Sequence, residues 1–377
     1  MRLLSDVVSW VADPYLRHAA SLALRAQGRT APNPLVGCVV VSDGHIVGEG
    51  YHPRAGQPHA EVFALAAAGR LARGADVYVT LEPCAHFGRT APCADALVAA
   101  GVARVIIGMP DPSAEAGGGA QRLSDAGIAV EFADDAGPFE AINEAWLHRV
   151  RSGRPFVTVK LALTLDGRLG MQAGERTSIT GSDGSIVTRA LREAADAVLV
   201  GAATVVADDP ALTRRDVVGQ PAEEQPLRVV LARSVVPHAD ARVFSDKTAP
   251  TLLVVVGDAT VPPLDERVAV TRLAHDASLV DIMLALGTHG VTDLLVEAGG
   301  RLFGSLLAEG LIDQLITVTA GGFAGADAPV LPLTATTVTE SEIERVLVPV
   351  ETGIVGDVIA TAWRPRTASQ HSNSVKG

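Results

Sequence analysis

A histidine, a glutamate and two cysteines in a fixed order constrain this chain more than any other feature of its sequence. His59 is followed two residues later by Glu61, and Cys84 and Cys93 come further along the chain, each directly after a proline. One imidazole and two thiolates can bind Zn²⁺ and leave its fourth position open for water, which is typical of catalytic zinc sites. Zinc brings the pKa of that water to about 7, and a carboxylate that is not a ligand must then move the proton. The sequence therefore predicts a catalytic zinc site with ligands His59, Cys84 and Cys93, in which Glu61 carries the proton.

The predicted secondary structure around these residues supports the zinc site. An Ala-rich helical run extends from His59 to about Leu71, a strand over 76–82 leads into Cys84, and a helix over 93–100 begins at the second cysteine. Helix N-termini favour the thiolate that a metal needs. This order of histidine, glutamate and two cysteines is that of zinc-dependent deaminases. The alternative, in which the cysteines are buried apolar residues and His59 is a core histidine, leaves the order unexplained.

Length and composition set outer limits on the fold. With 377 residues, of which 48% are hydrophobic and 20% charged, the chain is expected to form two globular domains. No run of about 18 apolar residues occurs, and Asp6 interrupts the apolar start, so neither a membrane span nor a signal peptide is expected. Because zinc takes two of the three cysteines, we expect no disulfide framework and a reducing, cytoplasmic location. The third, Cys38, lies in an apolar strand and is predicted to be an inert core thiol.

The formal net charge of −12 narrows the class of substrate. The chain has 31 basic residues against 43 acidic ones, and only eight phenylalanines and three tyrosines that could stack on bases. Deaminases that act on DNA or RNA must neutralise phosphates with clusters of lysine and arginine. We therefore expect a small free substrate and no nucleic acid.

Two successive α/β patterns divide the chain. In the first 150 residues, a hairpin turn at Asp43-Gly44 and alternating helices and strands, with a last helix over 140–149, predict an α/β sandwich around a central sheet. A short polar hinge at 151–155 precedes a second alternating pattern, which predicts another α/β domain. The predicted parts are a first domain, 1–150, a second domain, 151–366, and a tail, 367–377, that is expected to be disordered.

A glycine pair follows an apolar strand late in the chain. The strand over 294–297 ends directly before Gly299-Gly300, and a helix is predicted to start at once. Backbone N–H groups at such a helix start can bind phosphate. The alternative is a tight strand–helix joint without a ligand. The full G-x-G-x-x-G dinucleotide fingerprint is absent, so a Rossmann domain is not indicated.

Three motifs in the first domain extend beyond the zinc ligands. They read TAPNPLVGC at 30–38, HAE at 59–61 and LEPCAHFGRTAPC at 81–93, where eight residues separate the two cysteines. Together they resemble the bifunctional riboflavin-biosynthesis deaminase/reductase family. The resemblance implies a cytidine-deaminase-like three-layer sandwich that hydrolytically deaminates 2,5-diamino-6-(5-phosphoribosylamino)pyrimidin-4-one. It also implies substrate contacts from Asn33, His52, His86 and Arg89. As loop residues, these four could instead only satisfy backbone groups.

Segments of the second domain are similar to the reductase half of the same family. They read KLA at 160–162, LDGR at 165–168, DDPALTRR at 208–215 and EAGG at 297–300. The resemblance implies a dihydrofolate-reductase-like α/β domain that uses NADPH to reduce the ribosyl group to ribityl, giving 5-amino-6-(5-phosphoribitylamino)uracil. The implied NADPH contacts are Ala162, Ser178, Thr204, Asp208, Ser234, Gly299, Gly300, Arg301, Leu302, Phe303, Gly304 and Ser305. The implied substrate contacts are Arg176, Arg192, Leu212, Arg215 and Glu297. The guanidinium groups of Arg192 and Arg215 suit a ribose phosphate, which they can bind in a bidentate manner.

The second domain departs from the family pattern at three positions. Ser178 stands where a tryptophan is usual, Arg176 where a small hydroxyl residue is usual, and Ala232 where an aspartate is common. The missing aromatic residue could weaken NADPH binding or change its pose. Reductase activity is therefore the part of the prediction that these residues put in question.

Three hypotheses follow. The first is a bifunctional enzyme, with zinc deaminase and NADPH reductase acting in sequence. The second keeps the deaminase but makes the second domain a degenerate nucleotide-binding module. The third is a non-catalytic nucleotide-binding protein with structural zinc, which would need a fourth protein ligand and would give Glu61 no role. By resemblance, a homo-oligomer, a dimer or larger, is also expected.

Overall fold

The computed structural model of the protein describes residues 4–86, 91–113, 117–170, 178–216, 218–330 and 347–365. These residues form two compact units, which divide between Gly153 and Arg154. The tail predicted to be disordered, 367–377, lies outside the described residues. Among the described residues, no helix combines the length and the apolar character needed to cross a membrane.

The first unit is built on a five-stranded sheet with the order β2-β1-β3-β4-β5. Strand β1 pairs antiparallel with β2 and β3, and β3, β4 and β5 run parallel. Its elements are α1 (Leu4–Val8), α2 (Pro14–Leu24), β1 (Gly37–Ser42), β2 (His45–Tyr51), α3 (Ala60–Ala68), a 3₁₀ turn (Gly69–Ala72), β3 (Asp76–Val79), α4 (Cys93–Ala100), β4 (Arg104–Ile107), α5 (Gly119–Asp125), β5 (Ala129–Phe132), α6 (Gly137–Ile142) and α7 (Glu144–Ser152).

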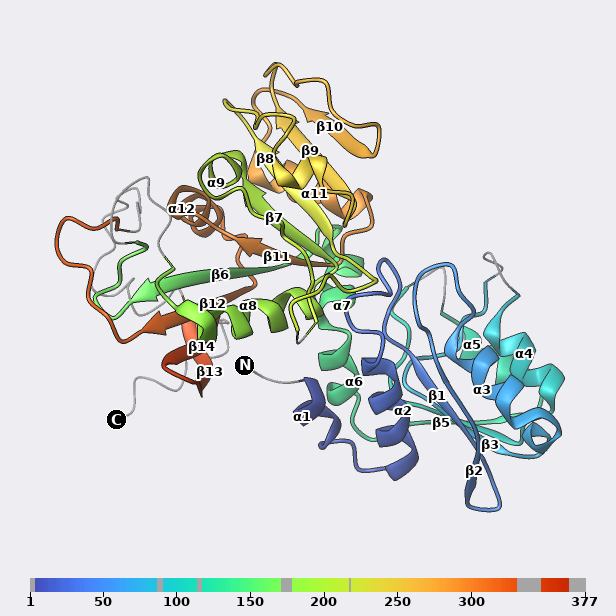
Figure 1. Ribbon diagram of the computed structural model, residues 1–377. Helices are drawn as coiled ribbons and strands as arrows, with labels where there is room; N and C mark the ends of the chain where they lie inside the picture. Colours follow the sequence, from blue (N-terminus) through green and yellow to red (C-terminus); the bar gives the residue numbers. More distant parts are fainter. Residues whose placement is uncertain are drawn as a thin grey trace. The chain divides into compact units, whose positions relative to one another are not determined.

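Helices cover both faces of this sheet, which makes three layers (Figure 1). Successive side chains of a strand point to opposite faces. Val39 therefore packs with α2 and α6 in one core cluster, whereas Cys38 and Val40 pack with α3, α4 and α5 in the other. Glycines allow close approach: a β-carbon at Gly37 would overlap the Ala19 carbonyl of α2. Cys38 is fully buried, and burial raises the pKa of its thiol, as expected for a core cysteine.

The second unit is built on a nine-stranded sheet with the order β10-β9-β8-β7-β11-β6-β12-β14-β13. The strands run parallel except at one edge, where β14 is antiparallel to β12 and β13. Its elements are β6 (Phe156–Thr164), α8 (Gly181–Ala194), β7 (Ala197–Gly201), α9 (Ala202–Asp208), β8 (Leu227–Ala232), α10 (Arg242–Ser245), β9 (Thr251–Val256), β10 (Val268–Leu273), α11 (Leu279–Thr288), β11 (Asp293–Glu297), α12 (Gly300–Ala308), β12 (Gln314–Ala320), β13 (Leu347–Val355) and β14 (Val358–Pro365).

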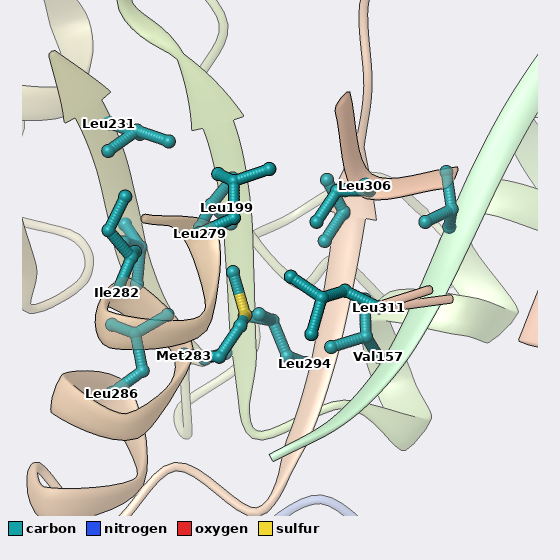
Figure 2. Close-up of a cluster of buried hydrophobic side chains, with 14 of the residues drawn as sticks. Val157, Leu199, Leu231, Leu279, Ile282, Met283, Leu286, Leu294, Leu306 and Leu311 are labelled. Atoms are coloured by element: carbon teal, nitrogen blue, oxygen red, sulfur yellow. The ribbon is translucent and has the colours of Figure 1, made fainter. Parts of the chain in front are cut away.

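A large apolar cluster joins this sheet to the helices on one of its faces. Figure 2 shows Leu199 and Leu294 of the central strands with Ile282 and Met283 of α11. The chain moves outward through β7, β8, β9 and β10 and then returns, so that β11 lies between β7 and β6. In parallel sheets, ligands bind beyond the carboxyl ends of the strands at such a change of direction. The fold therefore directs attention to the carboxyl ends of β6, β11 and β7.

Two features differ from the sequence prediction. The helix predicted over 140–149 is two helices, α6 and α7, because the chain leaves the helical conformation at Asn143. The Asn143 side chain is buried; its Oδ1 accepts from Leu35 N at 2.8 Å and its Nδ2 donates to Leu35 O at 3.0 Å. The antiparallel edge formed by β13 and β14 was not predicted.

Candidate active sites

His59, Cys84 and Cys93 meet at one point of the first unit. Their ligand atoms all lie within 4.8 Å of one another. His59 Nδ1 is 3.2 Å from Cys93 Sγ and 3.7 Å from Cys84 Sγ. One imidazole nitrogen and two sulfurs are a donor set used by catalytic zinc sites. The three residues fit one zinc ion, and no further His, Cys, Asp or Glu joins this cluster among the described residues.

Two helix starts position these ligands. His59 is the residue directly before α3, and Cys93 is the first residue of α4. Cys84 lies in the loop that joins β3 to α4, where the backbone N–H of Cys93 donates to its sulfur at 3.3 Å. Hydrogen bonds from the Cys93 thiol and from His59 lower the pKa of Cys84, and the same pairing raises that of Cys93. The protein thus favours a thiolate at Cys84, which is the form a metal binds.

Glu61 lies in the first turn of α3, beside the three ligands. Its side chain is 3% exposed, and burial raises the pKa of its carboxyl group. Its Oε2 atom has no hydrogen-bond partner among the described residues. Buried polar atoms in native proteins are almost always paired, so an unpaired one next to a metal cluster suggests a partner supplied by water or substrate. The carboxylate is therefore placed to accept and return a proton at that atom.

A second pair of predicted residues lies beside this cluster. The Asn33 amide donates to His52 Nε2 at 3.0 Å, and His52 Nδ1 donates to the Pro58 carbonyl at 3.1 Å. These two bonds place the proton on Nδ1, and burial lowers the pKa of His52, so the ring is neutral. The His52 and His59 rings meet edge to face with centroids 5.4 Å apart. His86 is exposed in the loop after Cys84, and Arg89 lies outside the described residues.

Glu82 was not singled out by the sequence, yet it organises the loop next to the cysteines. Its buried carboxylate accepts backbone N–H groups from Asp111 at 3.1 Å, Gly118 at 3.0 Å and Ala120 at 3.0 Å. These bonds hold the start of α5 against the loop that carries Pro83 and Cys84. The only signal in the sequence is that this glutamate directly precedes the Pro-Cys pair.

A change at Gly119 should disturb this joint. A β-carbon there would overlap the Pro83 carbonyl oxygen, a backbone atom that can move only with Cys84. We expect Gly119→Ala to destabilise the first unit by about 1–3 kcal/mol and to weaken zinc binding. Thermal unfolding and zinc content measure both effects. The matched control is Gly137→Ala, at an exposed helix start where the nearest atom belongs to the side chain of Asp135. Equal melting temperatures and zinc contents for the two variants would contradict this interpretation.

In the second unit, two predicted substrate residues form an ion pair near the carboxyl end of β11. Arg192 donates to the Glu297 carboxylate with Nε at 2.6 Å and Nη2 at 2.9 Å. Lys160, opposite Glu297 in the β6–β11 register, is half-buried, and burial lowers its pKa. Burial alone would raise the pKa of Glu297, but Arg192 and Lys160 outweigh it and hold that pKa below its usual value. Lys160 lies in the KLA segment, but one lysine in an apolar strand gives no sign in the sequence of its charged partner.

The other predicted residues of this unit come after strands β6, β7, β8 and β11 along the chain, apart from Ala162, which lies within β6. Thr204 of α9 and Gly299 are neighbours, since a β-carbon on Gly299 would lie 3.7 Å from Thr204 Oγ1. Gly299 and Gly300 form the start of α12, but the Phe303 side chain points into the core and could meet a ligand only through its backbone. Half-buried residues are Ala162, Asp208 and Leu302; exposed ones are Ser178, Ser234, Arg301 and Ser305; Gly304 is buried. Arg176 lies outside the described residues.

The segment that carries Leu212 and Arg215 lies beside the Arg192–Glu297 pair. Arg192 Nη1 donates to the Thr213 carbonyl at 3.2 Å. Leu212 is buried and has a left-handed φ of 51°, an unusual conformation for a branched residue. Arg215 donates to the Gly219 carbonyl at 2.7 Å and is half-buried. Within the second unit, contacts thus link Arg192, Glu297 and the 212–215 segment.

Comparison with known proteins identifies the family to which this chain belongs. Residues 11–109 match the cytidine and deoxycytidylate deaminase zinc-binding region, and residues 155–346 match the RibD C-terminal domain. The Escherichia coli riboflavin biosynthesis protein RibD is 42% identical over 325 residues, which cover 83% of this chain and 89% of that protein. The chain belongs to the RibD family. The family match and the two sheets confirm the predicted fold class, a cytidine-deaminase-like domain followed by a dihydrofolate-reductase-like one.

Solved RibD structures extend the similarity over almost the whole chain. An Acinetobacter baumannii RibD is 35% identical with a TM-score of 0.84, covering 97% of this chain and 100% of that one. A Thermotoga maritima protein named diaminohydroxyphosphoribosylaminopyrimidine deaminase/5-amino-6-(5-phosphoribosylamino)uracil reductase is 30% identical with a TM-score of 0.81, covering 96% and 99%. Both halves of the chain therefore have counterparts in bifunctional RibD proteins, with zinc and NADPH as their cofactors.

Proposed function

We propose that this chain catalyses two consecutive steps of riboflavin biosynthesis. The first is zinc-dependent hydrolytic deamination of 2,5-diamino-6-(5-phosphoribosylamino)pyrimidin-4-one. The second is NADPH-dependent reduction of the ribosyl group to ribityl, giving 5-amino-6-(5-phosphoribitylamino)uracil. The observation that carries the proposal is the buried Glu61 beside His59, Cys84 and Cys93, in a chain whose second half matches the RibD C-terminal domain.

In the deaminase site, each residue has a separate task. Zinc held by His59, Cys84 and Cys93 would supply a nucleophile for hydrolysis at neutral pH. The Glu61 carboxylate takes the proton of the attacking water at Oε2 and delivers it to the departing amine, which leaves as ammonia. The neutral His52 ring, fixed by Pro58 and Asn33, forms a wall of the site and presents no positive charge to the pyrimidine.

In the reductase site, the nicotinamide supplies the hydride and the protein supplies orientation. The carboxyl ends of the parallel strands place Thr204 and the start of α12 together, where the backbone N–H groups of a helix start suit a cofactor phosphate. Arg192, Glu297 and Lys160 form a charged group beside them. We propose that Arg192 and Arg215 bind the substrate phosphate, and that Arg192 and Glu297 hold each other in place until substrate arrives.

The two alternative hypotheses have less support. A degenerate second domain is disfavoured by the match to the RibD C-terminal domain over 155–346. Ala232, where the family often has aspartate, is fully buried among apolar residues such as Val230 and Val255. A structural zinc would need a fourth ligand, and Cys38, a local candidate, is a fully buried core thiol outside the cluster.

The experiment that tests the proposal follows both half-reactions in one preparation. Ammonia release from the diamino substrate reports the deaminase, and loss of NADPH absorbance with the deaminated pyrimidine supplied directly reports the reductase. Turnover in both assays supports the bifunctional enzyme. Ammonia release without NADPH oxidation would reduce the proposal to a deaminase with a silent second domain.

Replacing Arg215 should weaken binding of the phosphorylated substrate. A charge-assisted hydrogen bond contributes about 1.5–3 kcal/mol, so Arg215→Ala should raise the reductase KM for this substrate about 10- to 100-fold. The KM for NADPH should change far less. Steady-state kinetics with each substrate varied in turn measure the difference. An unchanged substrate KM would rule out the phosphate role.

We further propose that the enzyme is a cytoplasmic homo-oligomer, a dimer or larger, acting on the free pyrimidine ribotide. Free cysteines at both sulfur ligands are compatible with a reducing compartment. Strand β13 is an edge strand, and Val350, Ile354 and Ile359 on β13 and β14 are exposed apolar residues that a second copy could cover. Sedimentation velocity of the purified protein measures the assembly; a monomer at working concentration would contradict this proposal.

A further inference from the structure

Arg214, next to the proposed phosphate ligand Arg215, is one of the most deeply buried charged side chains in the described residues. Its side chain is only 2% exposed, so it cannot reach solvent-borne phosphate as its neighbour can. A buried guanidinium is tolerated only when its donors are hydrogen-bonded. Here Nε donates to the Arg192 carbonyl at 3.2 Å, Nη2 to the Ala195 carbonyl at 2.9 Å and Nη1 to the Glu224 carbonyl at 3.4 Å.

Two of these acceptors belong to the end of α8. The last carbonyls of a helix have no partner within the helix, and a cation there also meets the negative end of the helix dipole. Arg214 satisfies such a carbonyl at Arg192, and also that of Ala195, the residue directly after α8, with a side chain from another segment. Helix α8 carries Arg192, whose own guanidinium donates hydrogen bonds to the Glu297 carboxylate and to the Thr213 carbonyl. The end of α8 and the 212–215 segment are therefore joined in both directions.

The backbone of Arg214 is fixed just as firmly. Its N–H donates to Gln225 Oε1 at 2.8 Å, and Gln225 Nε2 donates back to its carbonyl at 3.0 Å. Ala222 N–H donates to the same carbonyl at 3.0 Å, and Arg215 forms an isolated bridge with Pro221. Glu193, 58% exposed, forms an ion pair with the guanidinium at 3.4 Å. One residue thus connects three segments: the end of α8, the 212–215 segment and residues 221–225.

We propose that Arg214 is a positioning residue of the reductase substrate site. It fixes Arg192 and Arg215 at the spacing that one phosphorylated sugar requires, and it does so through backbone carbonyls without touching the substrate. The inference rests on the proposed function, in which those two arginines bind the substrate. Lysine can replace it only in part, because a single ammonium group keeps the charge but lacks the planar fork that reaches carbonyls of separate segments.

The test compares Arg214→Met and Arg214→Lys in the full-length enzyme. We expect both to raise the reductase KM for the phosphorylated substrate, by about tenfold for methionine and less for lysine, which retains the charge. The KM for NADPH and the deaminase kcat of the same molecules should stay unchanged. The deaminase reaction also reports how much of each preparation is folded in its first unit.

A matched control separates positioning from stability. Arg154 is another largely buried arginine of this unit, paired with Asp313 at 2.6 and 2.8 Å near the amino end of β6. Arg154→Met should lower the melting temperature of the second unit without raising the substrate KM.

The outcomes are distinct. An unchanged substrate KM in the lysine variant and in a folded methionine variant would overturn the positioning role. If Arg214→Met fails to fold, the lysine variant decides alone. A normal KM in Arg215→Ala would instead overturn the phosphate role on which the inference rests.

Discussion

Glu61→Gln will lower the kcat of deamination by about 10²–10⁴-fold while zinc remains bound. Glutamine keeps the size and position of the side chain but cannot accept a proton. The structure gives the physical reason for so large an effect: the carboxylate is 3% exposed, and its Oε2 has no partner among the described residues. Within the described part of the chain, that oxygen is therefore left for water or substrate. Ammonia release measured beside zinc content checks the prediction.

The control for this variant is Glu140→Gln. It makes the same substitution in the same unit, at an exposed position in α6. It should deaminate at the wild-type rate. The reductase reaction should be unaffected in both variants, because the two units have separate apolar cores within the described residues. A glutamine variant that keeps its zinc and deaminates at the wild-type rate would show that another group carries the proton.

The sequence predicts the zinc cluster well because its parts are local. His59 and Glu61 are two residues apart at a helix start, and Cys93 begins the helix that follows the Cys84 loop. Short-range structure places each ligand at or near a helix start, the sheet brings the two starts together, and the order along the chain identifies the chemistry. The alternating α/β pattern is also readable along the chain, and it predicts an α/β sheet in each unit but not the antiparallel edge of the second.

The residues that the sequence could not predict act over long separations. Asn143 breaks a predicted helix and bonds to Leu35, 108 residues earlier. Such a partner is fixed only by the packing of α6 against the sheet, and no periodicity reveals it. Arg214 and Arg215 are adjacent and chemically identical in the sequence. Arg214 is nevertheless buried and bonded to backbone carbonyls, whereas Arg215 is half-buried. The difference comes from the partners of Arg214, the carbonyls of Arg192, Ala195 and Glu224, which lie 10 or more residues away along the chain.

The antiparallel edge of the second sheet was missed for a similar reason. Strand β13 contains Pro349, a register shift and several exposed residues, so its apolar pattern is weak. Strand β14 gains its partners from β12 and β13 at once. Which strands pair at the edge of a sheet depends on tertiary packing, and the β-propensity of the strand itself does not determine it.

Cys84→Ser should abolish deamination by removing zinc from the first unit, and it should leave the reductase active. The Cys84 sulfur lies 3.7 Å from His59 Nδ1 and accepts the Cys93 N–H, so it joins both helix starts. A serine hydroxyl is a far poorer zinc ligand than a thiolate. Because the ion binds only the folded form, its loss should also lower the melting temperature of the first unit. Metal analysis, both activity assays and a melting curve of the same preparation measure these effects.

The matched control is Cys38→Ala, which removes the one cysteine outside the cluster. The Cys38→Ala variant should still bind one zinc per chain, because the Cys38 side chain is fully buried in the apolar layer between β1 and α3 and does not reach the metal cluster. Full zinc content and full deamination in Cys84→Ser would exclude Cys84 as a zinc ligand. Loss of NADPH oxidation together with zinc would show that the second unit depends on the first, against the separation of their cores. Retained NADPH oxidation in a zinc-free chain would instead show that the two reactions can be switched off one at a time.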